Sequence, residues 1–373
     1  MLRLRIPRSI LGVLTALIVL PVAILAQSGS VTVAVTPTGK SVELLKMFQS
    51  DSDVELVRTP CQHLRDMFDH SGEGHDLVGE REAACDRVLD IVAGPPMPET
   101  NATSFIRGAR ITTDSRDRIV VTEPEKRTVH ILDFYARKYI RIDGNKDERL
   151  LYPFGVAVGP DDSIYVTDLK RGMVLVYNAE GKFKRYIGNF KGEAGFDRPT
   201  SIAVDRDTGR IYLVDSTRHL VFIFDRDGRT ITHIGKRGGG SGPSEFRLPT
   251  ELVLHGGELF VLDTQNERIQ VFDLDGHYKR EFKPRGMSAV SAKGIAVDAE
   301  GLIYVLFDIG AVEVFSPNGV RLFHFGHYGT DAGEFLQSQG IYIDSADRVF
   351  VTDTGNGRVQ IFQITNGTKT ASQ

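Results

Sequence analysis

The chain has 373 residues, of which 41% are hydrophobic and 25% charged, and its net charge is −4. This composition is typical of one large or two small globular domains. The basic residues form no continuous tract, so the sequence does not favour a protein that binds nucleic acid through its phosphates.

Residues 1–26 have the features of an export signal. Arg3, Arg5 and Arg8 precede a stretch without charge from Ile10 to Ala26, where small residues offer a cleavage site. The segment is either a cleaved signal peptide or an uncleaved signal anchor that tethers the protein to a membrane. In both cases we expect an extracytoplasmic protein that is secreted, periplasmic or anchored by its N-terminus.

Residues 27–87 are predicted to form a partly helical extension. Val42, Leu45 and Phe48 would share one face of a short helix over 41–48, and Thr59-Pro60 resembles the start of a second helix.

Cys61 and Cys85 are the only cysteines of the chain. In an oxidising compartment we expect them to form a disulfide, and the alternative is two free, buried thiols. A metal site built from them with His63, His70 and His75 is less favoured, because the spacing matches no zinc pattern.

Within the predicted propeller domain at 88–364, the chain repeats one unit six times between Arg110 and Ile364. The clearest copies begin at Gly155, Ser201, Glu251 and Gly340, and weaker copies begin at Arg110 and Gly294. A repeat of about 46 residues made of short β-prone runs is typical of a propeller or an array.

Each copy contains four β-prone segments separated by turn residues. In the copy from Gly155 the segments are Gly155–Val158, Ile164–Thr167, Val174–Tyr177 and Phe183–Ile187. The turn before the fourth segment ends in glycine at Gly228, Gly276 and Gly319, where a positive φ is expected. Third segments such as 221–224 are apolar at successive positions, which indicates burial on both sheet faces, as in radially stacked blades.

The sixth copy ends after its third segment, near Ile364, and a polar tail at 365–373 follows. We therefore predict that an N-terminal outer strand, Val88–Ala93, pairs with the strand Val359–Ile364 and closes the ring. The expected fold is an all-β, six-bladed propeller of four-stranded blades.

The phrases VTDTGNGRVQIF (Val351 to Phe362), VLDTQNERIQVFD (Val261 to Asp273) and FDRPTSIAVD (Phe196 to Asp205) resemble the NHL-repeat six-bladed propellers. The resemblance covers roughly residues 88 to 364. The chain contains no Trp, which argues against the WD40 class.

An acidic residue follows the second segment of five copies. These residues are Glu123, Asp168, Asp215, Asp263 and Asp353, and the fifth copy departs from the pattern with Phe307. A recurring carboxylate at a strand end favours a structural role, in which it accepts hydrogen bonds from backbone N–H groups or from Arg268 and Arg358. A ring of metal ligands is the less favoured interpretation.

The loops that enter the innermost strands differ from copy to copy, as expected of a binding site on a symmetric scaffold. Arg107 and Gln337 also lie in these loops. The candidate ligand-binding residues are Arg110, Tyr152, Phe154, Arg198, Thr200, Arg247, Glu251, Lys293 and Gln339.

Some proteins that this chain resembles are peptidyl-hydroxyglycine lyases, which hold zinc with channel histidines. Most histidines here belong to second, third or fourth segments, and His255 has no histidine at equivalent positions, so we predict no catalytic residue, metal ligand or cofactor. The expected function is that of a binding or scaffold propeller for an unidentified protein, peptide or glycan. The alternative is a metal-dependent lyase or hydrolase with zinc or calcium in the channel. RNA binding, found in other relatives, is disfavoured by the export signal and the acidic net charge.

Overall fold

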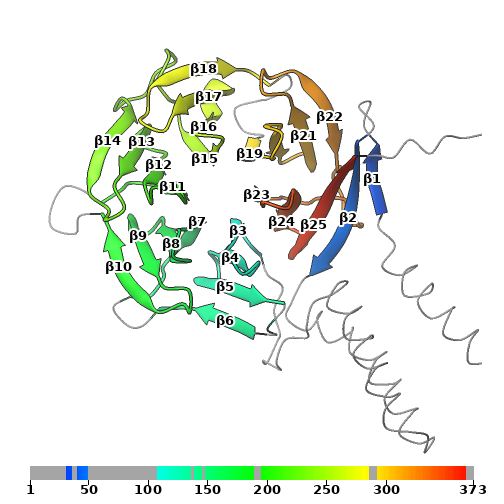
Figure 1. The fold of residues 1–373 in the computed structure, drawn as a ribbon, viewed down its shortest axis with the longest axis horizontal. Helices are drawn as coiled ribbons and strands as arrows, with labels where there is room; N and C mark the ends of the chain where they lie inside the picture. Colours follow the sequence, from blue (N-terminus) through cyan, green and yellow to red (C-terminus); the bar gives the residue numbers. More distant parts are fainter. Residues whose placement is uncertain are drawn as a thin grey trace, which may run out of the picture.

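The computed structural model describes residues 31–35, 40–48, 107–134, 136, 138–144, 148–188, 195–284 and 292–366. These ranges form six β-sheets arranged as blades around a central axis (Figure 1). The predicted export signal, both cysteines and residues 88–93 lie outside the described ranges. No helix within the described ranges is long and apolar enough to cross a membrane.

The first three blades are complete within one stretch of chain each. Blade 1 contains β3 (Ile111–Thr113), β4 (Ile119–Glu123), β5 (Thr128–Asp133) and β6 (Lys138–Ile142). Blade 2 contains β7 (Pro153–Val158), β8 (Ile164–Asp168), β9 (Met173–Tyr177) and β10 (Phe183–Ile187). Blade 3 contains β11 (Pro199–Val204), β12 (Ile211–Asp215), β13 (Leu220–Phe224) and β14 (Thr230–Gly235).

The last three blades follow the same plan, except that the sixth combines both ends of the chain. Blade 4 contains β15 (Pro249–His255), β16 (Glu258–Asp263), β17 (Arg268–Asp273) and β18 (Tyr278–Phe282), with a 3-10 turn η2 (Thr264–Asn266). Blade 5 contains β19 (Ala292–Val297), β20 (Ile303–Phe307), β21 (Ala311–Phe315) and β22 (Arg321–Phe325). Blade 6 contains β23 (Gly340–Ile343), β24 (Arg348–Asp353) and β25 (Arg358–Asn366), together with β2 (Lys40–Phe48) and β1 (Val31–Val35).

Blades 1 to 5 are antiparallel meanders that start at the axis and end at the rim, whereas in blade 6 the chain runs from β23 to β25 and the N-terminal strands β2 and β1 complete the sheet. The strand order confirms the four-segment plan, with β3, β7, β11, β15, β19 and β23 innermost. The first strand of each blade therefore starts at what we call the entry-loop face, where the loops between blades and the turns between second and third strands lie. The opposite face carries the turns that follow the first and third strands.

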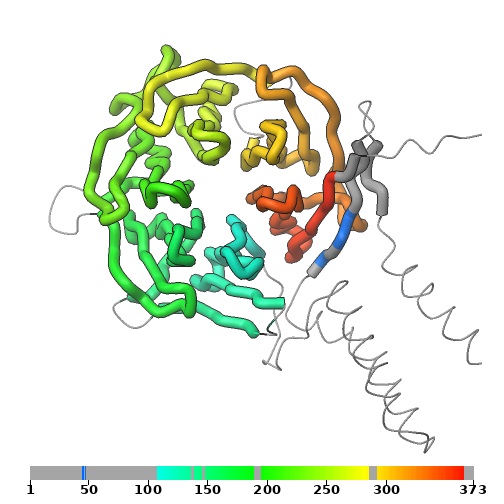
Figure 2. Tube along the Cα trace, in the orientation of Figure 1, coloured from blue at the N-terminus to red at the C-terminus, as the bar shows by residue number. Residues whose placement is uncertain are grey.

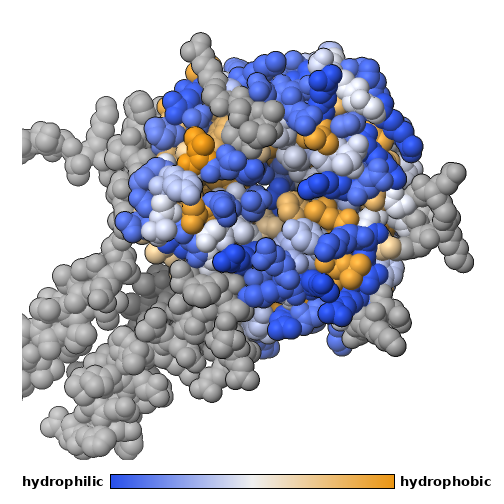
Figure 3. All heavy atoms as spheres, turned by 180° about the vertical axis from the view of Figure 1, so that it is seen from behind, coloured by the Kyte–Doolittle hydropathy of each residue, from blue (hydrophilic) through white to orange (hydrophobic). Residues whose placement is uncertain are grey.

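The hydrophobic core consists of clusters that each join two neighbouring blades. One cluster, for example, packs Ile111 and Val121 of blade 1 against Phe350 and Val359 of blade 6. Because second and third strands are covered on both faces, their apolar residues need not alternate with polar ones. The outward surface is more polar, and Figure 3 shows one face of the ring as mostly hydrophilic with apolar groups near its centre.

The turns before the fourth strands have the backbone that the glycines predicted. Gly228, Gly276 and Gly319 have φ values of +85°, +91° and +79°. Glycine adopts this left-handed conformation without the steric cost that a Cβ imposes.

An N-terminal strand closes the ring, as predicted, but it is not the strand that we expected. β2 pairs with β25 in an antiparallel register that places Val42 opposite Ile364 and Phe48 opposite Val359. Figure 2 shows the blue trace of β2 beside the red trace of β25. The prediction that Val88–Ala93 occupies this edge was wrong, because β2 already pairs along it.

The expected helix over 41–48 was also wrong, since these residues belong to β2. The register of β2 against β25 shifts between Leu44 and Lys46, which indicates a bulge or irregularity. An extra residue at such a point interrupts the two-residue alternation that identifies a strand in a sequence. Val42, Leu45 and Phe48 are therefore three positions apart, which is the spacing expected for one face of a helix.

Candidate functional site: the entry-loop face and the closed channel

The acidic column lies at the ends of the second strands, beneath the entry-loop face. Each carboxylate accepts a hydrogen bond from a backbone N–H of the loop that precedes its own blade. The donors are Arg107 to Glu123 at 3.1 Å, Tyr152 to Asp168 at 3.1 Å, Arg198 to Asp215 at 3.0 Å, Arg247 to Asp263 at 2.7 Å and Leu336 to Asp353 at 2.7 Å. The column therefore holds the entry loops in place.

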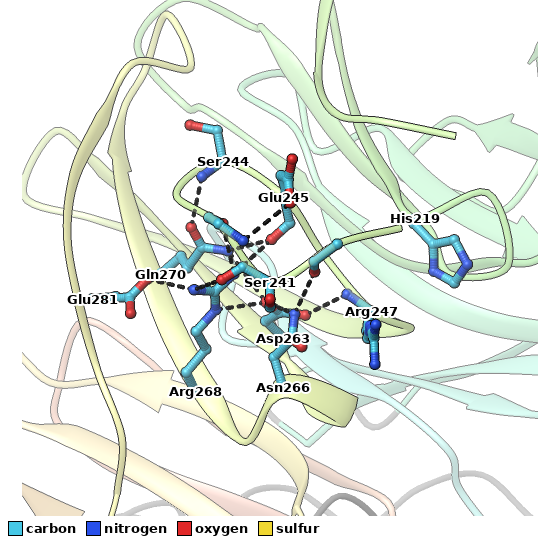
Figure 4. A network of polar contacts seen from close by, with 12 residues as sticks. His219, Ser241, Ser244, Glu245, Arg247, Asp263, Asn266, Arg268, Gln270 and Glu281 are labelled. Carbon is cyan, nitrogen blue, oxygen red and sulfur yellow. Dashed lines mark hydrogen bonds and ion pairs between the residues drawn. The ribbon is translucent and has the colours of Figure 1, made fainter. Parts of the chain in front are cut away.

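Figure 4 shows this arrangement in blade 4. Asp263 also accepts hydrogen bonds from Asn266 Nδ2 at 2.8 Å, from Arg268 Nε at 2.8 Å and from Gln270 Nε2 at 3.2 Å. Arg268 and Gln270 in turn each donate to the carbonyl oxygen of Glu245 in the entry loop. The buried charge of Asp263 is thus compensated by Arg268, and both residues fix the loop.

Blade 6 repeats the same contacts. Asp353 accepts hydrogen bonds from Asn356, Arg358 and Gln360 at 2.9, 2.6 and 3.0 Å. Arg358 and Gln360 both donate to the carbonyl of Glu334. The spacing of Asp, Asn, Arg and Gln is therefore the sequence pattern of a loop clamp.

In blade 1 a different pair of side chains, His130 and Tyr139, forms the hydrogen-bonded chain next to the acidic residue Glu123. His130 stands where blades 4 and 6 have glutamine, and its Nε2 lies 2.8 Å from Glu123 Oε2 while its Nδ1 lies 2.7 Å from the hydroxyl of Tyr139. Although burial raises the pKa of Glu123, the hydrogen bonds from His130 and from the Arg107 N–H hold it below its ordinary value.

The residues whose N–H groups are held in this way point different side chains toward solvent. Arg107, Arg198 and Arg247 are exposed, and none of them forms an ion pair with another residue of the described ranges. Figure 4 shows the side chain of Arg247 directed away from the network around Asp263. In blade 2 the equivalent residue is Tyr152, and Lys170 places its ammonium 5.4 Å from the centre of that ring. Four blades thus place a cation around the axis.

The other candidate residues are less available. Lys293 forms an ion pair with Asp308 at 3.2 Å, Thr200 is buried, and Gln339 is half-buried. Phe154 is half-buried beneath the guanidinium of Arg110, whose carbon lies 4.7 Å from the ring centre.

Arg110 and Glu251 meet across the axis of the ring. Arg110 Nε lies 2.5 Å from Glu251 Oε2, although blades 1 and 4 are opposite each other. The guanidinium also donates to the carbonyls of Lys293 in blade 5, at 3.2 Å, and of Gln339 in blade 6. Ser201 of blade 3 donates to the second oxygen of Glu251.

Side chains or carbonyls from all six blades therefore converge on one ion pair, which we call the axial lock. Arg110 and Glu251 are both buried, at 8% exposure each. Burial raises the pKa of Glu251 above its ordinary value despite the neighbouring Arg110. The axial lock closes the channel at the entry-loop end.

Behind the axial lock lies a cavity of about 660 Å³ that the innermost strands of all six blades line. Of the nine candidate ligand-binding residues, only Arg110 and Glu251 reach it. The cavity extends toward the opposite face, where its lining includes Arg206, His255 and Ser345. The sequence did not indicate this cavity, because it depends on how the blades are spaced around the axis.

The described histidines are dispersed. His219 accepts a hydrogen bond from the Leu248 N–H, His277 contacts Asp273, and His327 contacts Glu334. Within the described ranges, no three His, Cys, Asp or Glu side chains are placed to hold one metal ion.

Family models match most of the ring. A model described as a 6-bladed beta-propeller matches residues 111–219 and 203–311, and one described as an NHL repeat matches residues 335–362. The NHL repeat-containing protein 3 of Mus musculus is 32% identical over 148 residues, which cover 35% of this chain and 42% of that protein. The alignment thus spans less than half the length of this relative.

Solved structures share the architecture at low identity. An auxiliary nutrient binding protein from Bacteroides thetaiotaomicron has a TM-score of 0.53 at 13% identity, covering 73% of this chain and 71% of that chain. A virginiamycin B lyase from Staphylococcus aureus has a TM-score of 0.51 at 13% identity, covering 68% and 80%. Likeness at this level of identity shows the fold alone.

Proposed function

The chain belongs to the six-bladed β-propeller family with NHL repeats, and from that premise we propose that it is a binding propeller for an acidic peptide or protein segment outside the cytoplasm. The partner would lie on the entry-loop face, over the axial lock. The proposed compartment rests on the export signal in residues 1–26.

The observation that carries this proposal is the set of exposed arginines around the axis. Arg107, Arg198 and Arg247 have backbones held by buried carboxylates, so their positions are defined, while their guanidinium groups are not used in ion pairs within the described ranges. A guanidinium matches a carboxylate with two parallel hydrogen bonds, which favours an acidic partner. Lys170 adds a further positive charge in blade 2.

Because the channel is closed at this end, the entry-loop face is better suited to bind a partner than to let a molecule pass through the ring. Arg110 spans the axis and is compensated by Glu251, so the centre of this face is a solid floor. A peptide or protein segment can rest across such a floor and contact loops of several blades at once. The variation among the loops would supply specificity.

A charge-reversal experiment tests the proposal. The probe is a fluorescein-labelled peptide rich in glutamate and aspartate, and its affinity is measured by fluorescence anisotropy. We expect the double variant Arg198→Glu, Arg247→Glu to bind the peptide about tenfold or more weakly, since each lost contact corresponds to roughly 1 kcal/mol. Added salt should also weaken binding to the native protein.

The matched control reverses two exposed charges on the opposite face. Lys182 lies in the turn between β9 and β10, and Arg229 in the turn between β13 and β14. Changing both to glutamate alters the net charge by the same amount and should leave the affinity nearly unchanged. Equal losses in both double variants, or no loss in either, would contradict a site on the entry-loop face.

The metal-dependent lyase or hydrolase stays an alternative hypothesis. Metal analysis of the purified full chain tests it, because a channel metal that serves catalysis would be present in stoichiometric amount.

A further inference from the structure

The cavity behind the axial lock has the size of a small-molecule site. Its volume of about 660 Å³ lies within the range of ligand pockets in proteins. Arg110, Ser201 and Glu251 form its floor, where Arg110 and Glu251 form an ion pair and the Ser201 hydroxyl donates to Glu251. The floor therefore offers no uncompensated charge to a ligand.

The wall of the cavity combines backbone polar groups with apolar side chains. The innermost strand of each blade is the last strand of its sheet, so one of its backbone edges has no partner strand. Such N–H and C=O groups need hydrogen-bonding partners. Between them, Ala203, Val253, Leu254 and Tyr342 line the cavity and are only half-buried.

The mouth of the cavity lies on the face opposite the entry loops. Arg206, in the turn after β11 of blade 3, donates from Nη2 to the carbonyl of Thr113 at the end of β3 in blade 1, at 3.0 Å. Because Arg206 is exposed and its partner belongs to another blade, the side chain forms a bar between two blades at the mouth. Asp207 and His255 also line the cavity.

We propose that this cavity binds a small uncharged molecule that has an apolar body and one or two hydrogen-bonding groups. The apolar body would contact the half-buried side chains, and its polar groups would pair with free backbone edges. A charged group at the inner end of the cavity would lose its hydration without gaining a partner ion, because the charges of Arg110 and Glu251 in the floor are already paired. This site is separate from the entry-loop face and does not depend on the function proposed for it.

A neutral fluorescent probe tests the inference. Prodan, a naphthalene ketone without charge, shifts its emission to the blue in an apolar site. We expect one prodan to bind per full-length chain. Ala203→Phe and Val253→Trp each fill the cavity, so each should weaken prodan binding at least about tenfold.

Two controls separate the cavity from other surfaces. Ile231→Trp adds an equally large ring on the exposed face of β14, where Ile231 is 50% exposed, and should leave prodan binding intact. The variant Arg198→Glu, Arg247→Glu should also bind prodan normally, so failure of the acidic-peptide site and failure of this site are distinguishable.

Arg206→Ala supplies a test that does not rely on a bulky residue in the core. Removing the bar should accelerate both association and dissociation of prodan in stopped-flow measurements. Native-like urea midpoints identify which filled variants are folded. The inference is overturned if the native protein gives no blue-shifted emission up to roughly 100 µM prodan, if a folded filled variant binds as the native protein does, or if Arg206→Ala leaves both rates unchanged.

Discussion

At the scale of single residues, the axial lock is a buried ion pair whose two members depend on each other. Arg110 and Glu251 are buried together and form an ion pair at the centre of the ring. Removing one member of a buried ion pair leaves the other charge without compensation, which typically costs about 3–5 kcal/mol. Replacing both by apolar residues removes both desolvation costs and is much less damaging.

We therefore predict strong coupling between these two residues. Arg110→Met and Glu251→Leu should each lower the free energy of unfolding by about 3 kcal/mol, and the double variant should lose clearly less than the sum. Urea unfolding of the native protein, both single variants and the double variant measures the coupling. Additive losses would show that the ion pair does not act as a unit.

At the scale of the blade, the acidic column links a regular framework to variable loops. Asp263 and Asp353 hold their loops through the same Asn, Arg and Gln pattern, whereas Glu123 uses His130. The acidic column was visible in the sequence because it recurs at a fixed place in the copies. The structure adds which N–H groups the carboxylates hold, among them those of the loop residues Arg198 and Arg247.

Glu123 gives this element a predictable response to pH. Its pKa is lower in the folded chain than the ordinary 4.5, so its ionised form stabilises the fold above about pH 4.5 and this contribution is lost as the pH falls toward the folded pKa. Glu123→Gln should cost about 1–2 kcal/mol at pH 7. The difference between native and variant should shrink below pH 4.5, as measured by urea unfolding across pH. A constant difference at all pH values would refute this assignment.

At the scale of the whole molecule, the ring is closed by a strand that is far from its partner in the sequence. β2 covers the edge of β25, and β1 in turn pairs with β2. Leu44 joins the cluster between blades 5 and 6. An uncovered edge of β25 would present unpaired backbone groups to other chains.

Removing the closing strand should therefore destabilise the ring and promote association. A variant that lacks residues 1–48 should melt about 5–10 °C below the native protein and associate in a concentration-dependent manner. A variant that lacks only residues 1–30 retains β1 and β2 and should behave like the native protein. Thermal melting and light scattering at several concentrations check both expectations. Identical behaviour of the two deletions would mean that β2 does not stabilise the ring.

The sequence by itself determined the blade. Apolar runs, turn glycines and the acidic column are encoded within about 46 residues, where each strand pairs with its neighbour in the chain. The sequence also determined that an N-terminal strand must complete the sixth blade, because the last copy is one strand short.

Only the tertiary structure decided which strand that is, which residues meet at the axis and where the channel is hollow. The sequence did not identify the closing strand because an irregularity near Leu44 interrupts its alternation of side chains. Arg110 meets Glu251 because blades 1 and 4 are opposite in a ring of six. These features join residues that are distant in the chain, so no local pattern records them. Their positions follow from closing the ring, which brings charges, backbone edges and cavity walls together around one axis.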